Sequence, residues 1–308
     1  MSPKHLKFIA IGLAALLLLW GGSALVSHRS DSVTGALGLP ALSQADVDTI
    51  RLVKGTDSIL LVKHPPAEWS ANGHRAAPDV ASQLLQAVTD SVRPEVVAQD
   101  TSSFARLGVD STGGRWLTVR SRAKGSLTLI LGARGPEFQS LYVRRPGDPH
   151  VYLWRGPLAT AADRPRDDWR DKRIAVLQPD SIVAIDVERR KDRYTLRRTG
   201  KQWALQGAPA DSVAVARYLD RLKTITAAGF ATPKDIDSSK AVRATRRLAV
   251  HGTGGVLLVS LAFDSTAATL LVHHLAGTGG EGATVYRMNS WDVDAITPAS
   301  RSLLPTKK

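Results

Sequence analysis

The sequence predicts an α+β protein with an N-terminal transmembrane helix followed by two tandem duplicated units, each an antiparallel sheet with a packed helix. Three observations support this fold class: an uncharged apolar segment at the N-terminus, a tryptophan-containing phrase that recurs further along the chain, and short alternating segments separated by glycine-containing turns. The predicted boundaries are residues 1–27 for the anchor, 28–44 for a linker, 45–174 for the first unit and 175–308 for the second.

The N-terminal segment Phe8–Val26 contains no charged residue and follows two lysines, Lys4 and Lys7. About 20 apolar residues are enough to span a bilayer as a helix. Because basic residues stay on the cytoplasmic side, we expect a single-pass protein of the bacterial inner membrane with its folded units outside the cytoplasm. The alternative is a cleaved signal peptide, since the small residues Gly22–Ala24 precede Leu25, although the apolar run is longer than a signal core of roughly 7–15 residues.

The composition is that of a basic globular protein, with 43% hydrophobic residues and a formal net charge of +13. The chain has no cysteine, which excludes disulfides, thiolate metal sites, cysteine nucleophiles and a lipidated cysteine. A basic surplus can attract nucleic acid, anionic lipid head groups or acidic polymers. The basic residues occur as scattered doublets without interleaved aromatic residues, and the predicted compartment lies away from nucleic acid. We therefore expect no nucleic-acid partner and retain an anionic polymer as a candidate partner.

One phrase occurs twice: "AEWSANG" begins at Ala67, and "KQWALQG" begins at Lys201. Several pairs of landmarks share one offset of 134 positions. These pairs are Trp69 with Trp203, Leu85 with Leu219, and Tyr152 with Tyr286. Because this period exceeds the roughly 20–50 residues of solenoid repeats, the pattern indicates the duplication of a whole domain.

Each copy opens with two alternating strand segments, a tryptophan and a helix. The helices are predicted at 79–92, with Leu84, Leu85 and Val88 on the apolar face, and at 213–225. The second half of each copy is rich in short strand segments joined by glycine-containing turns, which is typical of antiparallel sheet. The two tryptophans of the repeated phrase are therefore expected to occupy equivalent, largely buried positions.

Four features resemble a bacterial family catalogued as domain of unknown function 4340: the N-terminal anchor, the strand-strand-tryptophan-helix opening, "FARLGVD" at Phe104–Asp110 and "DDWRDKRI" at Asp167–Ile174. The resemblance is clearest over Ala45–Ile174. The second copy departs from it, because the stretch Thr232–Leu248 has no counterpart of the phrase Leu107–Val109. Members of this family look like companions of ABC-type transport and gliding-motility proteins of the envelope. The resemblance therefore implies an accessory role and no defined activity.

Two short motifs invite a chemical interpretation. The stretch "GTGGEG" at Gly277–Gly282 matches the G-x-G-x-x-G dinucleotide fingerprint, which needs a strand before it and a helix after it. Strand-like segments flank it on both sides here, so a hairpin loop is predicted. The pair His273–His274 invites a metal site, but neighbouring residues of a strand point to opposite faces and cannot easily share one ion.

The densest charge cluster is "RPRDDWRDKR" at Arg164–Arg173. One interpretation is a site in which the carboxylates bind a cation and the arginines hold an anionic group. The residues concerned are Asp167, Asp168 and Asp171, and Arg170 and Arg173. The favoured interpretation is a charged linking segment with ordinary ion pairs, anchored on the sheet by Trp169. We therefore assign no catalytic, cofactor-binding or metal-ligating residue from the sequence, and we expect no cofactor.

The leading functional hypothesis is a non-enzymatic, membrane-anchored accessory protein of the envelope, with protein partners in an ABC-type transport or motility system, as the resemblance implies. The first alternative is a binder of anionic envelope polymer or lipid head groups, which the basic surplus supports. The second alternative is a carboxylate-dependent hydrolase that works through residues such as Asp167 and Asp171. It requires a buried pair of carboxylates with a raised pKa.

Overall fold

The computed structural model describes residues 37, 42, 44–89, 94–122, 125–238, 244–264 and 270–305. The predicted membrane anchor Phe8–Val26 lies outside these residues, so it stays a prediction. None of the described helices is both long and apolar enough to cross a membrane. The chain divides into two compact units, Met1–Pro165 and Arg166–Lys308. The division therefore falls before most of the charged segment, whereas the sequence predicts a boundary at 174/175.

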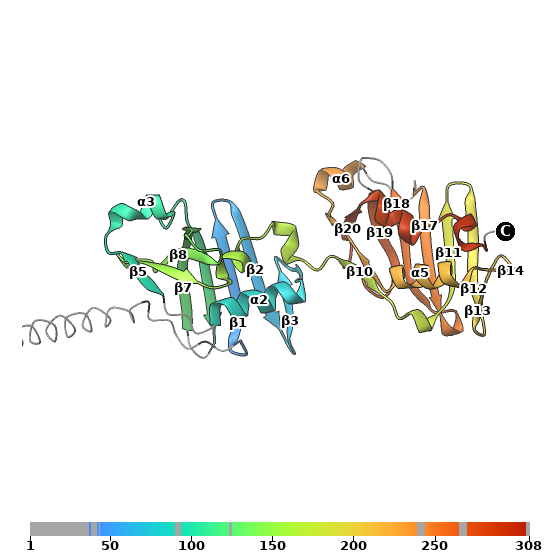
Figure 1. The fold of residues 1–308 in the computed structure, drawn as a ribbon, viewed down its shortest axis with the longest axis horizontal. Coiled ribbons are helices and arrows are strands. Elements are labelled where there is room, and N and C mark those ends of the chain that lie inside the picture. The colour runs from blue at the N-terminus through green and yellow to red at the C-terminus, as the bar shows by residue number, and fades with distance from the viewer. Residues whose placement is uncertain are drawn as a thin grey trace, which may run out of the picture. The chain divides into compact units, whose positions relative to one another are not determined.

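The first unit is built on one nine-stranded antiparallel sheet with the order β4-β3-β2-β1-β6-β7-β8-β9-β5 (Figure 1). Its strands are β1 (Val47–Lys54), β2 (Asp57–His64), β3 (Glu68–Ala71), β4 (His74–Arg75), β5 (Glu95–Ala98), β6 (Arg115–Ser121), β7 (Gly125–Arg134), β8 (Ser140–Arg144) and β9 (Val151–Arg155). Its helices are α2 (Pro78–Thr89), α3 (Phe104–Leu107) and α4 (Leu158–Ala162), with a short 3-10 helix η2 (Thr101–Ser103).

The second unit has a sheet with the order β14-β13-β12-β11-β17-β18-β19-β20-β16. Its strands are β11 (Ile182–Arg189), β12 (Asp192–Thr199), β13 (Gln202–Leu205), β14 (Ala208–Pro209), β16 (Gly229–Phe230), β17 (Arg246–Gly252), β18 (Leu257–Asp264), β19 (Leu270–Gly277) and β20 (Val285–Met288). Its helices are α5 (Ser212–Leu222), α6 (Pro233–Ser238) and α7 (Ser290–Ile296), with 3-10 helices η3 (Arg166–Trp169), η4 (Pro179–Ser181), η6 (Thr253–Gly255) and η7 (Ser300–Leu303). A separate two-stranded sheet pairs β10 (Arg173–Val176) with β15 (Thr224–Thr226).

The predicted α+β class with antiparallel sheets is confirmed, and the two large sheets have the same order of equivalent strands, as expected for two copies of one unit. Trp69 of β3 pairs with Lys63, and Trp203 of β13 pairs with Arg198, so the two tryptophans occupy equivalent register positions. Both side chains are only partly buried, which is less than the sequence predicts. The reason is their place, because β3 and β13 lie next to the edge of each sheet.

One helix of each unit packs on the sheet because its apolar residues recur every three or four positions. The buried residues are Val80, Leu84 and Val88 in α2, and Val215, Tyr218 and Leu222 in α5. Helix α5 begins at a cap, since the Asp211 side chain accepts a hydrogen bond from the amide of Ala214 at 2.8 Å. In Figure 1, α2 and α5 each cross the strands of their own sheet.

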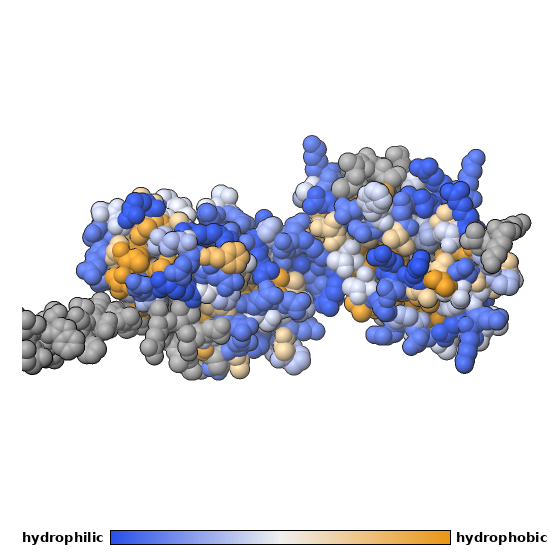
Figure 2. All heavy atoms as spheres, in the orientation of Figure 1, coloured by the Kyte–Doolittle hydropathy of each residue, from blue (hydrophilic) through white to orange (hydrophobic). Residues whose placement is uncertain are grey.

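The strands alternate between buried apolar and exposed polar side chains, which is typical of a sheet with one covered face. In β1, Ile50 and Leu52 are buried and Arg51 between them is exposed. In β6, Val119 is buried and Arg120 is exposed. Each large aliphatic side chain buried in this way contributes about 1.5–3 kcal/mol. Hydrophilic residues cover most of the visible surface of both units (Figure 2).

Candidate functional site

From Arg166 on, the charged segment belongs to the second unit, and its Trp169 is completely buried. Each of its carboxylates faces a basic side chain. The oxygen–nitrogen distances are 2.5 Å for Asp168 with Lys172, 2.7 Å for Asp171 with Arg173 and 3.4 Å for Asp167 with Arg287. The guanidinium carbon of Arg170 lies 3.6 Å from the centre of the Phe230 ring, and its Nη2 lies 3.0 Å from the Glu281 carboxylate. These contacts agree with the favoured interpretation of a segment with ordinary ion pairs, and the anchoring role of Trp169 stays a prediction.

The glycine-rich stretch Gly277–Gly282 connects the antiparallel strands β19 and β20, so it forms the predicted hairpin loop. The amide of Gly280 donates a hydrogen bond to the carbonyl of Ile174 at 2.7 Å. A Cβ atom on Gly279 would lie only 2.4 Å from the same oxygen. The loop therefore packs closely on β10 and does not form the strand-to-helix turn that a dinucleotide needs.

The two neighbouring histidines have different surroundings. His274 Nε2 lies 3.4 Å from the carbonyl of Thr278, whereas His273 Nε2 is buried without a hydrogen-bond partner in the described part of the chain. Burial lowers the pKa of His273, and the negative charge of Asp264 offsets part of this effect. Within the described ranges, no group of three or more histidine or acidic side chains is placed to hold a metal ion.

We expect the second unit to lose stability as the pH falls below about 6.5, the ordinary pKa of imidazole. The folded protein lowers the pKa of His273, so the unfolded chain takes up a proton at a higher pH than the folded chain does. The stabilisation is complete above this pH and decreases toward the folded pKa. The urea midpoint of the second unit is measured at about pH 7.5 and at about pH 5.5, and the difference between the two values should be smaller in His273→Gln than in the wild type. The control is His64→Gln, an exposed histidine of the first unit, in which this difference should be the same as in the wild type. An unchanged pH effect in His273→Gln contradicts this expectation.

The phrase "FARLGVD" forms helix α3 and a loop that packs on the first sheet through Leu107 and Val109, which join a buried cluster with Ile130. Gly108 ends α3 with a φ of +65°, a left-handed conformation that favours glycine. The loop also approaches β7 very closely, because a Cβ atom on Gly132 would lie 2.4 Å from the carbonyl oxygen of Leu107. Two glycines therefore allow the loop to lie against the sheet.

Arg144 of β8 holds this loop through hydrogen bonds and a contact with an aromatic ring. Its Nε and Nη2 both donate hydrogen bonds to the carbonyl of Val109 at 3.1 Å. Its guanidinium carbon lies 4.1 Å from the centre of the Phe104 ring. Burial lowers the pKa of Arg144, while the negative charges of Asp148 and Asp110 oppose this effect. The side chain is thus a buried cation that serves as the support of the loop.

The turn after the loop is held by Asp110. Its Oδ1 accepts hydrogen bonds from the hydroxyl of Thr112 at 2.5 Å and from the amides of Gly113 and Thr112 at 2.7 and 2.9 Å. Because these donors favour the charged carboxylate, they lower the pKa of Asp110 to about 2. The turn leads directly into β6, whose first residue is Arg115.

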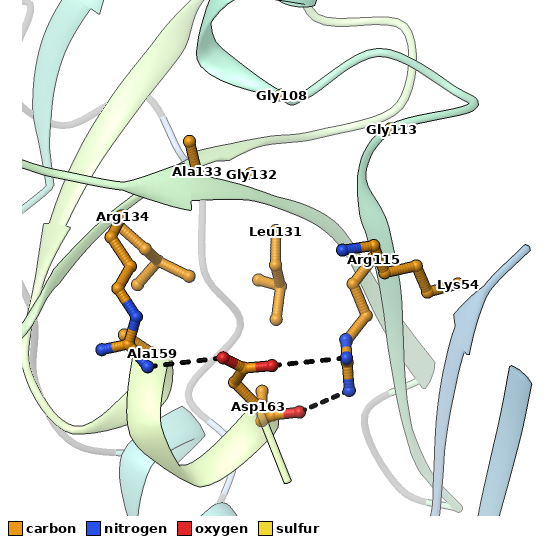
Figure 3. A pocket seen from close by; sticks show the side chains of 12 residues that line it. Lys54, Gly108, Gly113, Arg115, Leu131, Gly132, Ala133, Arg134, Ala159 and Asp163 are labelled. Carbon is orange, nitrogen blue, oxygen red and sulfur yellow. Dashed lines mark hydrogen bonds and ion pairs between the residues drawn. The ribbon is translucent and has the colours of Figure 1, made fainter. Parts of the chain in front are cut away.

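A pocket of about 350 Å³ lies beside this loop in the first unit (Figure 3). Its polar lining comes from Lys54 at the end of β1, Arg115 at the start of β6, Arg134 at the end of β7 and Asp163 after α4, and its apolar lining includes Leu131 and Leu141. The glycines of the loop and of β7 also line the pocket, and their lack of side chains leaves it open. Polar groups from four separate segments therefore meet over an aliphatic floor.

The carboxylate of Asp163 lies between the two arginines of the pocket (Figure 3). The Nη2 atoms of Arg115 and Arg134 lie 3.5 and 3.4 Å from its two oxygens. Arg115 is held more firmly on its other side, because its Nη1 donates to the carbonyl of Ala162 at 2.7 Å. Lys54 has no ion pair in the part of the chain that the structure describes. The pocket lining thus has three basic side chains and one carboxylate, which gives a surplus of positive charge.

The second unit contains the equivalent positions, one with the same side chain and one with a different basic side chain. Lys54 and Arg189 are the last residues of the equivalent strands β1 and β11. Arg115 and Arg246 are the first residues of β6 and β17, which pair with these strands in the two sheets. The contacts of these side chains can therefore be compared at equivalent positions of the two sheets.

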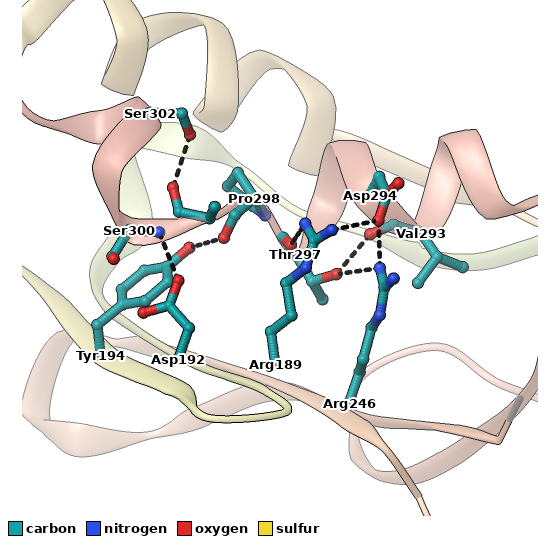
Figure 4. A network of polar contacts seen from close by, with 11 residues as sticks. Arg189, Asp192, Tyr194, Arg246, Val293, Asp294, Thr297, Pro298, Ser300 and Ser302 are labelled. Carbon is teal, nitrogen blue, oxygen red and sulfur yellow. Dashed lines mark hydrogen bonds and ion pairs between the residues drawn. The ribbon is translucent and has the colours of Figure 1, made fainter.

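In the second unit these side chains contact helix α7 directly (Figure 4). Arg189 Nη2 lies 3.1 Å from Asp294 Oδ1, and Arg246 Nη1 contacts the same oxygen. Arg189 Nη1 also donates to the carbonyl of Thr297 at 3.2 Å. The side chain of Arg246 is only 14% exposed. At this place, therefore, both basic side chains of the second copy are paired with one carboxylate, whereas Lys54 of the first copy has no ion pair among the described residues.

A family model described as Domain of unknown function (DUF4340) matches residues 69–243, which is more than half of the 308 residues. The chain belongs to this family. The resemblance drawn from the sequence is thereby confirmed. The DUF4340 match includes the pocket residues Arg115, Arg134 and Asp163, and it begins after Lys54. No curated protein and no solved structure matches the chain.

The sequence reasoning missed the pocket, although it singled out the loop beside it. Lys54, Arg115, Arg134 and Asp163 are far apart in the chain and belong to no motif. The signal in the sequence was a difference between the two copies, because the loop phrase Leu107–Val109 of the first copy has no counterpart in the second copy. Such a difference between duplicated units indicates a position at which one unit has a function that the other lacks.

Proposed function

We propose that this DUF4340 protein is a non-enzymatic accessory protein of the bacterial cell envelope, held at the inner membrane by Phe8–Val26, and that its first unit binds an anionic group of an envelope lipid or polymer. The observation that carries this proposal is the difference between the copies. The first copy has a pocket lined by Lys54, Arg115 and Arg134, while Arg189 and Arg246 at the equivalent positions of the second copy are both paired with Asp294.

The chemistry of the pocket supports an anionic ligand. Guanidinium groups offer several N–H donors in a fixed plane and match the oxygens of carboxylates and phosphates. The aliphatic floor formed by Leu131 and Leu141 lowers the local polarity, which strengthens ionic contacts made above it. Because the rim is open to solvent, binding is expected to weaken as salt screens these charges.

The proposal predicts that reversing the charge of two pocket residues abolishes the binding of a polyanion. The full chain, purified in an uncharged detergent, is titrated calorimetrically with polyphosphate. The variant Lys54→Glu/Arg134→Glu changes two pocket side chains. Arg134 is 54% exposed and Lys54 is also exposed, so we expect the fold to be preserved. We expect its affinity to fall by at least about tenfold, since each reversed charge turns an attraction into a repulsion.

The matched control is Arg193→Glu/Lys201→Glu, which makes the same change of net charge at two exposed positions of the second unit. Its affinity should stay within about twofold of the wild type if binding is local to the pocket, because well-separated surface charges are screened. Equal losses in both variants would mean that polyphosphate responds only to the overall charge, and the pocket would then have no role.

The accessory role in an ABC-type transport or motility system is supported by the family resemblance alone, and it is part of the same proposal. It is tested by cross-linking the wild-type chain in intact cells with a reagent that does not cross the inner membrane. Recovery of transporter subunits is the expected result. Labelling that requires broken cells would place the folded units in the cytoplasm and exclude this role.

A further inference from the structure

Asp163 has the position that a bound anion would take in the pocket. Its two oxygens face one arginine each, at 3.5 Å from Arg115 and 3.4 Å from Arg134. Charge-assisted contacts between guanidinium and carboxylate groups are usually about 2.7–2.9 Å long. The carboxylate is also 63% exposed. It is therefore a loosely held occupant of the arginine pair.

The pocket has more oriented positive charge than one carboxylate such as that of Asp163 can pair with. Arg115 is only 17% exposed and is oriented by its 2.7 Å hydrogen bond to the carbonyl of Ala162, so it keeps its direction without Asp163. Lys54 lines the same pocket and adds a third cation. A carboxylate has two oxygens and satisfies only the two arginines. A phosphate group has enough oxygens to meet Lys54 as well.

We propose that the pocket binds a phosphate group between Arg115, Arg134 and Lys54, and that Asp163 occupies this place in the free protein and leaves it when phosphate binds. This proposal rests on the proposed function and names its ligand. The exchange is favourable because a loosely held, exposed ion pair contributes little, whereas a phosphate brings more charge and more acceptor oxygens. No covalent step is involved.

The second unit shows the opposite design at the equivalent place. Asp294 is shared by Arg189 at 3.1 Å and by Arg246, whose side chain is 14% exposed. Both arginines are further tied to Thr297, Arg189 through the carbonyl and Arg246 through the hydroxyl. Asp294 lies closer to its arginines than Asp163 does to Arg115 and Arg134, so phosphate is expected to bind in the first unit.

The test is the variant Asp163→Asn in the full chain, titrated with inorganic phosphate, with glycerol 1-phosphate as a lipid head group, with polyphosphate as a polymer and with acetate as a carboxylate. Removing the competing carboxylate should tighten phosphate binding by about fivefold to tenfold, the scale of two exposed ion pairs. The charge-matched control is Asp220→Asn, an exposed residue of α5, which should bind phosphate as the wild type does.

Each outcome decides between the proposals. Tighter phosphate binding in Asp163→Asn alone, with weak acetate binding, supports the exchange. Equal or weaker phosphate binding in Asp163→Asn overturns the exchange and leaves the proposed function intact. Acetate binding as strong as phosphate binding overturns the assignment of phosphate. Failure of every phosphate probe, in wild type and variant alike, overturns both this inference and the proposed function. Preference for glycerol 1-phosphate or for polyphosphate identifies the lipid or the polymer as the source.

Discussion

Replacing Trp169 by alanine is expected to lower the free energy of unfolding of the second unit by about 3–5 kcal/mol. The side chain is completely buried, and it belongs to η3, the first element of this unit. Its removal leaves a cavity where the buried indole ring lay. The effect is measured by urea unfolding followed with hydrogen exchange, which separates the two units.

The control for this prediction is Trp291→Ala. Trp291 is 84% exposed, so its replacement should change the free energy of unfolding by no more than about 0.5 kcal/mol. If both substitutions cost the same, the buried anchor is not what joins the segment to the second unit.

Replacing Arg144 by alanine is expected to destabilise the first unit by about 2–4 kcal/mol. The substitution leaves the buried carbonyl of Val109 without its two donors and removes the cation from the ring of Phe104. Lysine should not restore stability, because an ammonium group does not reproduce the planar pair of N–H donors. Hydrogen exchange of the loop 104–110 reports the loss directly.

Arg106→Ala is the matched control, because Arg106 belongs to the same loop and is exposed. We expect it to leave the protection of the loop unchanged. Wild-type protection of the loop in Arg144→Ala would show that the apolar contacts of Leu107 and Val109 suffice to hold it.

Much of the fold was accessible from the sequence because it depends on local patterns. Alternation of apolar and polar residues identifies strands such as β1, and the recurrence of Trp69 as Trp203 indicates two equivalent sheets. The boundary between the units was not accessible in this way. It depends on contacts of Asp167 and Arg170 with residues that follow them by many positions, such as Arg287, Phe230 and Glu281.

The candidate site was less accessible for a physical reason. Its charged residues stand at the ends of strands and after a short helix, where no periodicity constrains them. Only the register of the sheet brings Arg115 next to Lys54, and only the path of α4 brings Asp163 between the arginines. Single arginines and aspartates at such places carry no signal in a sequence as rich in arginine as this one.

Asp163 also belongs to the short connector between α4, which ends at Ala162, and η3, which begins at Arg166. The connector is tied to the first unit by Asp163 and by Arg164, whose Nε donates to the carbonyl of Ala161 at 3.2 Å. A phosphate that displaces Asp163 removes one of these two contacts, so the connector is held to the first unit by fewer interactions. By thermodynamic linkage, a change that draws Asp163 away from the arginines favours phosphate binding, just as phosphate binding favours the release of Asp163. Phosphate binding in the pocket and the attachment of the connector to the first unit are then coupled.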